Sequence, residues 1–494
     1  MASEYGILSL FPPVIAIVLA ILTKQVFISL LFGIFLGWLI INNWSLLDGL
    51  FATLQALVDV FQDPGNTRTI MFAALVGGLI LFIQKSGGVE GFIKRMTTFL
   101  QRYEQKKSGS NKVVVQLLAW ATGLLIFVES SISVLTVGAL YRPVFDDLKI
   151  SREKLAYIAD SSSAPSSILI PFNGWGAFIM GILAADFNDP FATMMRSIPY
   201  NFYPFLALIG VLIIILVKKD LGAMKKAEVR VQTTGALLNE NSQPMVSDEL
   251  TDVPTKAGVQ PKAFNMILPI AVMVILMPIM LTYTGWETAT NDLPNAGGFE
   301  KVRYAIGQGS GSTSVLTAVS FSLLFCVFFY WIQGIFKITE SVDIVLKGIS
   351  GLMPLALLML FAFAIGAVCK ELKTGIYVAS VAEQWLSPNL VPFLIFLVSC
   401  FIAFSTGTSW GTFAIMLAIA IPMARQMDAN IYMTIAAALG GGVFGDHCSP
   451  ISDTTILSSM ASATDHIDHV RTQAPYALIA GGIAALMYLV LGLF

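Results

Sequence analysis

Two aspartates lie close together inside an apolar stretch that is long enough to cross a bilayer. Residues 445–453 read Gly-Asp-His-Cys-Ser-Pro-Ile-Ser-Asp, so Asp446 and Asp453 stand on either side of Pro450. A charge at the centre of a membrane helix costs at least ~2.5 kcal/mol, and proline breaks the helix in which it lies. Carboxylate and carbonyl oxygens at such a break are ligands for a hard cation such as Na⁺. The pattern therefore predicts a cation site within the membrane.

A weaker copy of this string lies in the first half of the chain. Asp160 is followed by Ser-Ser-Ser-Ala-Pro-Ser-Ser, so both strings carry Asp, then Ser, then Pro and Ser. We expect each string to interrupt a membrane helix. Broken helices at corresponding positions of two halves are the sequence pattern that best indicates the binding site of a secondary transporter.

The buried acids suggest a way to exchange cations for protons. Removal from water favours the protonated form of a carboxyl group. Na⁺ arriving at Asp446, Asp453 or Asp160 would displace that proton, and competition at one site would produce antiport. The alternative for each acid is that it only accepts hydrogen bonds at a helix break.

Two further interruptions add oxygen ligands, Glu129-Ser-Ser and Ser405-Thr-Gly-Thr-Ser. Beside the acids, the candidate ion ligands are Ser449, Ser452, Thr454, Ser405, Thr406 and Thr408. The candidates for holding a proton or a substrate are Glu129, Ser130, Ser131, Asn173, Trp175, Trp410 and His447. Serine and threonine in membrane helices commonly bond the carbonyl four residues earlier, which is the plainer role for each hydroxyl. His447 fits a proton relay or an ordinary interior histidine, and the stretch 465–469, with two more histidines, is expected to be a solvated loop rather than a metal site.

Composition indicates a membrane protein. Of 494 residues, 56% are hydrophobic and 12% are charged, whereas soluble domains carry about 25% charged residues. The net charge of −2 and the lack of a basic patch give no indication of nucleic-acid binding. The four cysteines lie in apolar segments without paired spacing and indicate neither disulfides nor a metal site. No cofactor is expected beyond Na⁺ as the coupling ion.

The apolar runs fall into two sets separated by a polar linker. The predicted fold is an all-α polytopic membrane protein of two inverted repeats, each with about five transmembrane helices, a re-entrant hairpin and a broken helix. The predicted boundaries in the first repeat, 1–217, are scaffold helices 7–84, hairpin 113–141 and broken helix 155–184. After a solvated cytoplasmic linker, 218–262, those in the second repeat, 263–494, are scaffold helices 264–369, hairpin 391–424 and broken helix 430–463.

The inverted topology follows from the distribution of basic residues. The loops 85–112 and 142–154 carry seven and four Lys or Arg residues, so both are expected on the cytoplasmic side. The apolar segment between them must then enter and leave the membrane on one side, as a hairpin. Each half keeps an odd number of crossings, which inverts the halves and predicts ten crossings with both termini outside.

The string Gly-Asp-His-Cys-Ser-Pro-Ile-Ser-Asp-Thr-Thr at 445–455, with Asp160-Ser-Ser-Ser-Ala-Pro upstream, resembles the NhaC family of Na⁺/H⁺ antiporters. The resemblance implies a prokaryotic inner-membrane exchanger surrounded by lipid. It also implies a transport domain that moves against a scaffold domain, often within a homodimer. Carried over residue by residue, the ion-site residues are Asp446, Ser449, Ser452, Asp453 and Thr454, with Asp160 as their counterpart in the first repeat.

Two transport functions remain open, and an enzyme is disfavoured. The first is Na⁺/H⁺ antiport by alternating access, and the second is Na⁺-coupled transport or exchange of a small organic solute such as an amino acid, amine or organic acid. Phe444-Gly-Asp superficially matches membrane aspartyl proteases, but Val443 stands where their first glycine belongs and the chain has no Tyr-Asp pair. Repeated broken helices also suit alternating access better than a channel.

Overall fold

The computed structural model describes residues 5–23, 25–92, 94–95, 98, 112–127, 130–240, 242, 255–382, 386–450 and 452–493. Within these ranges the chain forms helices and no strand, which confirms the predicted all-α class. The helices of the first part are α1 (Phe11–Thr23), α2 (Val26–Ile41), α3 (Leu46–Asp59), α4 (Pro64–Lys85), α6 (Lys112–Leu125), α7 (Ser130–Asp147), α8 (Arg152–Leu169), α9 (Gly174–Leu183), α10 (Pro190–Ser197), α11 (Phe202–Val217) and α12 (Gly222–Thr234).

The second part continues with long apolar helices and then with the elements that carry the acidic string. These helices are α14 (Phe264–Asp292), α15 (Gly298–Gln308), α16 (Gly311–Ile332), α17 (Ile338–Glu371), α18 (Thr374–Ala382), α19 (Val391–Thr406), α20 (Ser409–Gln426), α21 (Ile431–Cys448), α22 (Asp453–Ala461) and α23 (His466–Gly492).

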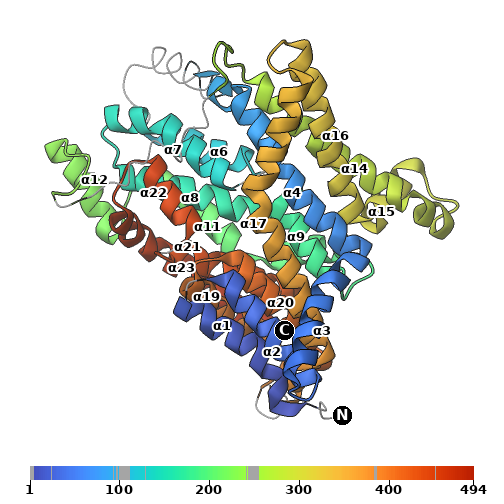
Figure 1. Ribbon diagram of the computed structural model, residues 1–494. Coiled ribbons are helices and arrows are strands. Elements are labelled where there is room, and N and C mark those ends of the chain that lie inside the picture. The colour runs from blue at the N-terminus through green and yellow to red at the C-terminus, as the bar shows by residue number, and fades with distance from the viewer. Residues whose placement is uncertain are drawn as a thin grey trace.

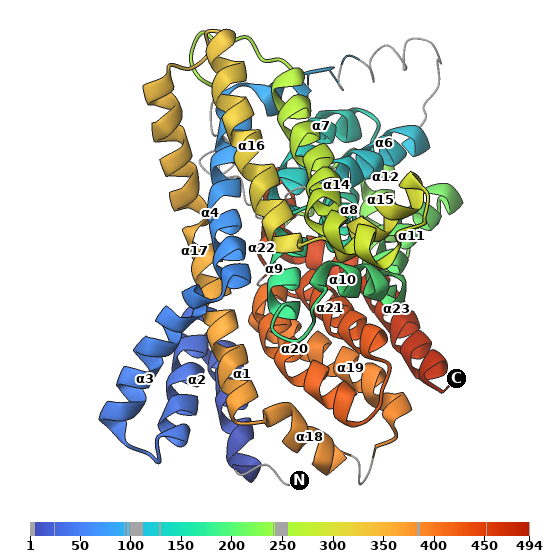
Figure 2. The same cartoon turned by 90° about the vertical axis from the view of Figure 1, so that its right-hand side faces the viewer.

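The helices form two groups. In both views α4, α16 and α17 stand together on one side, while α6, α7, α8, α11 and α23 lie on the other (Figures 1 and 2). The α4 helix packs on α16 and α17, and α8 contacts α6, α7, α11 and α23. The α21 helix contacts α19, α20, α11, α8 and α23. This helix therefore joins the elements that carry the predicted site.

Five described helices are long and apolar enough to cross a bilayer, and eight if each bent pair counts as one span. One bent pair is α8 with α9, which meet at 45°. Shorter apolar helices lie at Gly6–Ala20, Phe27–Ile41 and Lys112–Leu125. The protein is thus polytopic, and the count of ten crossings and the inversion of the two repeats stay predictions.

The two predicted hairpins are pairs of packed helices. Thr122 on α6 hydrogen-bonds Tyr141 on α7 over 2.9 Å, and Ser133 donates to the Gly123 carbonyl over 3.0 Å, so these helices pack on each other. The second pair, α19 and α20, is connected through Gly407, whose φ of +68° suits glycine, and Thr408. Whether either hairpin enters and leaves the membrane on one side stays a prediction.

The structure moves one break from its predicted position. We expected the helix to be interrupted at Asp160 and the serines after it, but α8 runs through Asp160 and Pro165 and ends at Leu169. The break lies at residues 170–173. Inside α8, Ser163 and Ser166 donate to carbonyls three residues earlier, which ties these hydroxyls to the helix. The break in the second half lies where predicted, at residues 449–452.

The prediction of a solvated linker at 218–262 is wrong for residues 222–234, which form α12. Glu228 on this helix is buried and accepts hydrogen bonds from the amide and the hydroxyl of Ser151, at 2.8 and 2.7 Å. Arg230 pairs with the buried Glu153 over 2.8 Å. Two polar residues of the predicted linker, Glu228 and Arg230, thus pair with residues at the start of α8.

Candidate functional site

A very close contact between α19 and α21 sets the position of Asp446. A Cβ atom on Gly441 would lie 2.5 Å from the Phe396 carbonyl oxygen, and one on Gly445 would lie 2.3 Å from that of Cys400. The two glycines, four residues apart, let the helix backbones touch, as small residues do in membrane helix pairs. The glycine run therefore holds the end of α21 against the second hairpin.

Asp446 lies at that end and is 6% exposed. The hydroxyl of Ser409, the first residue of α20, donates to its Oδ2 over 2.6 Å. The Ser449 hydroxyl donates to the Phe404 carbonyl near the end of α19 over 2.8 Å. The second hairpin and the α21 break therefore meet close to this carboxylate.

The break itself exposes two helix ends. Ser449 follows the last turn of α21, and Ser452 precedes Asp453, the first residue of α22. The hydroxyls of Ser452 and Thr454 lie 3.2 Å apart, and both residues are buried. The side chain of Asp453 lies outside the described part of the structure. A carbonyl end and an amide end thus occupy one break, the arrangement that transporters use for ions and anionic groups.

The hairpin tip orients its hydroxyls in different directions. Thr406 donates to the Ile402 carbonyl in its own helix, the plainer role considered for it. Thr408 precedes α20, and its carbonyl accepts from Thr412. Ser405 is partly exposed. Ser409, which stood in the same string but not among the predicted ligands, is the residue that contacts Asp446.

Asp160 forms a second acidic centre on α8 and is fully buried. Its Oδ2 accepts from Gln473 Nε2 at 2.7 Å and from the Thr455 hydroxyl at 3.3 Å. His447 Nε2 lies 3.7 Å from the same oxygen. Asp160 therefore contacts α21, α22 and α23 at once, and its contact on α21, His447, is the residue that follows Asp446 in the chain.

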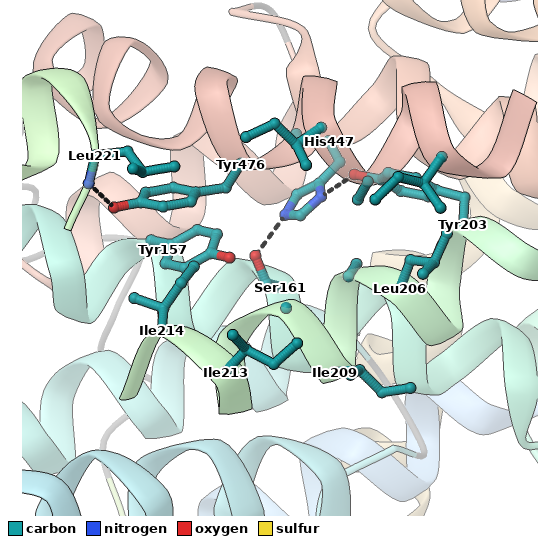
Figure 3. Close-up of a pocket in the computed structure, with 16 residues that line it drawn as sticks. Tyr157, Ser161, Tyr203, Leu206, Ile209, Ile213, Ile214, Leu221, His447 and Tyr476 are labelled. Carbon is teal, nitrogen blue, oxygen red and sulfur yellow. Dashed lines mark hydrogen bonds between the residues drawn. The ribbon is translucent and has the colours of Figure 1, made fainter. Parts of the chain in front are cut away.

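His447 turns toward α8 and α11, away from the partner of Asp446. Its Nε2 lies 3.1 Å from the Ser161 hydroxyl and its Nδ1 lies 2.6 Å from the Tyr203 hydroxyl (Figure 3). These groups border a cavity of about 230 Å³ whose other walls include Ile213 and Ile479. Both isoleucines are more than half exposed, so the cavity reaches the apolar outer surface.

The first hairpin is fastened to the α8–α9 break by Asn173. Its side-chain amide donates to the carbonyls of Phe127 and Ser167, at 2.9 and 2.7 Å. Its Oδ1 accepts from the amide of Gly176 and so caps α9. Asn173 was predicted as a substrate ligand, whereas the structure uses its side chain to join backbone segments.

The remaining candidates lie near this junction or outside the described residues. Ser130 is buried at the start of α7, whereas Glu129 and the side chain of Ser131 lie outside the described part of the chain. The rings of Trp175 on α9 and Trp410 on α20 have centroids 5.1 Å apart. They therefore pack on each other between the two halves.

The stretch 465–469 is not a solvated loop, which corrects that prediction. Asp465 caps α23, and His469 is fully buried within it. His469 Nε2 contacts Gln473 Oε1 at 2.9 Å, and its Nδ1 contacts the Ser459 hydroxyl at 2.9 Å. His469 was noted in the sequence but was assigned to a solvated loop, and Gln473 was missed because a single glutamine at the start of an apolar run has no motif.

Comparison with known proteins supplies an independent line of evidence. The sequence model of the Na⁺/H⁺ antiporter family matches residues 188–493. An uncharacterised protein of Haemophilus influenzae is 31% identical, and the alignment covers 98% of this chain and 90% of that protein. The malate-2H⁺/Na⁺-lactate antiporter of Bacillus subtilis is 30% identical over 131 residues, 23% of this chain and 28% of that protein.

Among solved structures, the YdaH transporter of Alcanivorax borkumensis superimposes with a TM-score of 0.57 at 14% identity. The match covers 90% of this chain and 88% of that chain. At this identity the likeness concerns the fold alone. The match to the family model confirms the resemblance seen in the Gly-Asp-x-x-Ser-Pro string.

Proposed function

The chain belongs to the Na⁺/H⁺ antiporter family, and we propose that it exchanges Na⁺ for protons across a prokaryotic inner membrane. The observation that carries the proposal is that two buried carboxylates are both placed at one helix, α21. Asp446 lies within it, and Asp160 reaches it from α8. A buried carboxylate in a membrane protein must be protonated, bind a cation or accept a hydrogen bond. If a proton and Na⁺ replace each other on it, the result is antiport.

In this proposal Na⁺ binds at Asp446, with Asp453 and the hydroxyls around the α21 break as further oxygen ligands. Ser409 of the second hairpin donates to Asp446, and Ser449 at the α21 break donates to the Phe404 carbonyl of α19. In this proposal both the hairpin and the broken helix therefore supply oxygen ligands to Na⁺. A proton takes the place of Na⁺ on the opposite side of the membrane. The alternating movement would shift the hairpins and broken helices against the scaffold. We expect a homodimer, no cofactor beyond Na⁺, and no enzymatic activity.

One observation favours a second candidate function, the exchange or Na⁺-coupled transport of a small organic solute. Part of this chain is similar to an antiporter whose name includes malate and lactate together with protons and Na⁺. The paired aromatic rings of Trp175 and Trp410 also border the second hairpin, where a solute could pack. The two candidates differ in whether proton movement needs an organic substrate.

The test is transport by purified protein in sealed liposomes that contain a pH dye. A Na⁺ gradient is the only driving force, and no organic solute is present. We expect proton movement that Asp446→Asn abolishes while the variant stays folded. Asp428→Asn, at an exposed aspartate before α21, is the matched control and should behave like the wild type.

The outcome that contradicts Na⁺/H⁺ exchange is equally clear. If the wild type moves no protons but is still stabilised by Na⁺ against thermal unfolding, Na⁺ binds and the second substrate is an organic solute. A screen of amino acids, amines and organic acids under the same gradient then identifies it.

A further inference from the structure

One oxygen of the Asp160 carboxylate has no partner among the described residues. Asp160 is fully buried, and its contacts with Gln473 and Thr455 all fall on Oδ2, leaving Oδ1 unpaired. Pro165 has no amide hydrogen, so the Ser161 carbonyl, next to Asp160 on α8, lacks its helical donor. An ionised carboxylate left in this state is costly, and a cation at Oδ1 removes the cost.

Gln473 is the residue that fixes the other oxygen. It is 1% exposed, and its Nε2 donates both to Asp160 Oδ2 and to the His447 carbonyl, each over 2.7 Å. Both acceptors require the amide nitrogen on this side, because an ionised carboxylate and a carbonyl cannot donate. The amide oxygen must then face His469.

His469 fixes the orientation of this amide. Its Nε2 lies 2.9 Å from Gln473 Oε1 and must carry a hydrogen to bond it. Its Nδ1 lies 2.9 Å from the hydroxyl of Ser459 on α22. With the ring held at both nitrogens, the Gln473 amide cannot turn over without losing three hydrogen bonds.

We propose that Gln473 is a positioning residue for ion exchange, which acts through Asp160. By donating to Oδ2 it holds the carboxylate in a state in which Oδ1, unpaired among the described residues, can bind a cation. By donating also to the His447 carbonyl it ties this state to α21, one residue from Asp446. The proposal rests on the proposed exchange of Na⁺ for protons and names a residue outside the predicted site.

The test replaces Gln473 by leucine, which keeps the bulk and removes the donor. We expect the Na⁺ concentration for half-maximal exchange to rise about tenfold, because a hydrogen bond to a charged group is lost. The pH profile should move to higher pH, because a carboxylate without its donor holds its proton more tightly and Na⁺ displaces it only when protons are scarcer. Gln116→Leu is the matched control, since Gln116 is also a buried glutamine but donates only to the Lys112 carbonyl of its own helix.

The isosteric variant Gln473→Glu distinguishes a loss of the hydrogen bond from a loss of folded protein. It fills the same space but places a second acid beside Asp160, so we expect the same upward shift of the pH profile. A lower maximal rate with unchanged Na⁺ dependence and unchanged pH profile in both variants overturns the proposal, because that is what a purely structural glutamine would give.

Stabilisation by Na⁺ against thermal unfolding separates this proposal from the proposed function. If the wild type is stabilised by Na⁺ but moves no protons, the proton exchange fails. The role of Gln473 is then tested by measuring the Na⁺ concentration that gives half-maximal thermal stabilisation. This concentration should be about tenfold higher for Gln473→Leu than for the wild type. A wild type on which Na⁺ has no effect overturns both proposals.

Discussion

The two buried aspartates differ in what surrounds them. Asp446 receives the hydroxyl of Ser409 from the second hairpin, whereas Asp160 receives the amide of Gln473 from α23. Hydroxyls can turn to donate to a carboxylate or to accept from a carboxylic acid, while an amide nitrogen only donates. Asp446 thus has a partner that can either donate or accept a hydrogen bond, and Asp160 has one that only donates.

This difference gives a prediction for Ser409→Ala. The variant removes the 2.6 Å hydrogen bond to Asp446, and a bond to a charged group is worth about 1.5–3 kcal/mol. We expect the Na⁺ concentration for half-maximal transport to rise at least about tenfold. Ser399→Ala is the control, because Ser399 is equally buried on α19 and its hydroxyl has no partner within the described residues. Equal effects of the two variants would place Ser409 outside the site.

Residue types in the sequence identified the acids but not all of their partners. The string from Ser405 to Ser409 indicated a polar hairpin tip, yet only the geometry of the turn at Gly407 decides which hydroxyl faces α21. Asn173 looked like a ligand because it is polar in an apolar run, and a helix cap has the same appearance in a sequence. Gln473 could be identified as a partner of Asp160 only from the tertiary structure, since its partners lie on α8 and α21.

At the level of elements, proline marked one break correctly and the other incorrectly. Pro450 lies in the gap between α21 and α22, but Pro165 lies inside α8. A proline can be accommodated within a helix when neighbouring helices and side chains satisfy the freed groups. The α8–α9 break follows Asp160 by ten residues, counting from Asp160 to Ile170, whereas the α21 break follows Asp446 by three, to Ser449. The two aspartates therefore do not occupy equivalent positions relative to their breaks.

The contact between α19 and α21 gives a prediction for Gly445→Ala. The new Cβ would lie 2.3 Å from the Cys400 carbonyl oxygen and 2.6 Å from the Phe404 nitrogen, so the helices must separate. Separation moves Asp446 from Ser409, and we expect Na⁺-driven transport in liposomes to fall at least about tenfold with a lower unfolding temperature. Gly482→Ala, on a face of α23 where a Cβ meets nothing within 4 Å, should be tolerated. Normal transport by Gly445→Ala would show that α19 can move away from α21 without changing the site around Asp446.

At the level of the whole molecule, the apolar runs predicted most of the long helices, because a bilayer requires long apolar segments. Shorter helices such as α3 and α12 were missed, since they are amphipathic or polar and depend on their neighbours. The linker is the main revision: α12 contacts both α8 and α23, which carry Asp160 and Gln473. The segment that joins the two parts of the chain is therefore packed against elements of the candidate site.

Competition between Na⁺ and protons must also appear in the stability of the whole protein. A ligand that binds only the folded state stabilises it by about 2.7 kcal/mol at a hundred times its Kd. If each Na⁺ displaces one proton, every unit by which pH falls below the titration range weakens apparent Na⁺ binding about tenfold. We therefore expect the rise in unfolding temperature caused by Na⁺ to shrink as pH is lowered, with choline at equal ionic strength as the control. A Na⁺ effect that does not change with pH would mean that Na⁺ binds without displacing a proton, which coupling to an organic solute permits and exchange for protons at a shared site forbids.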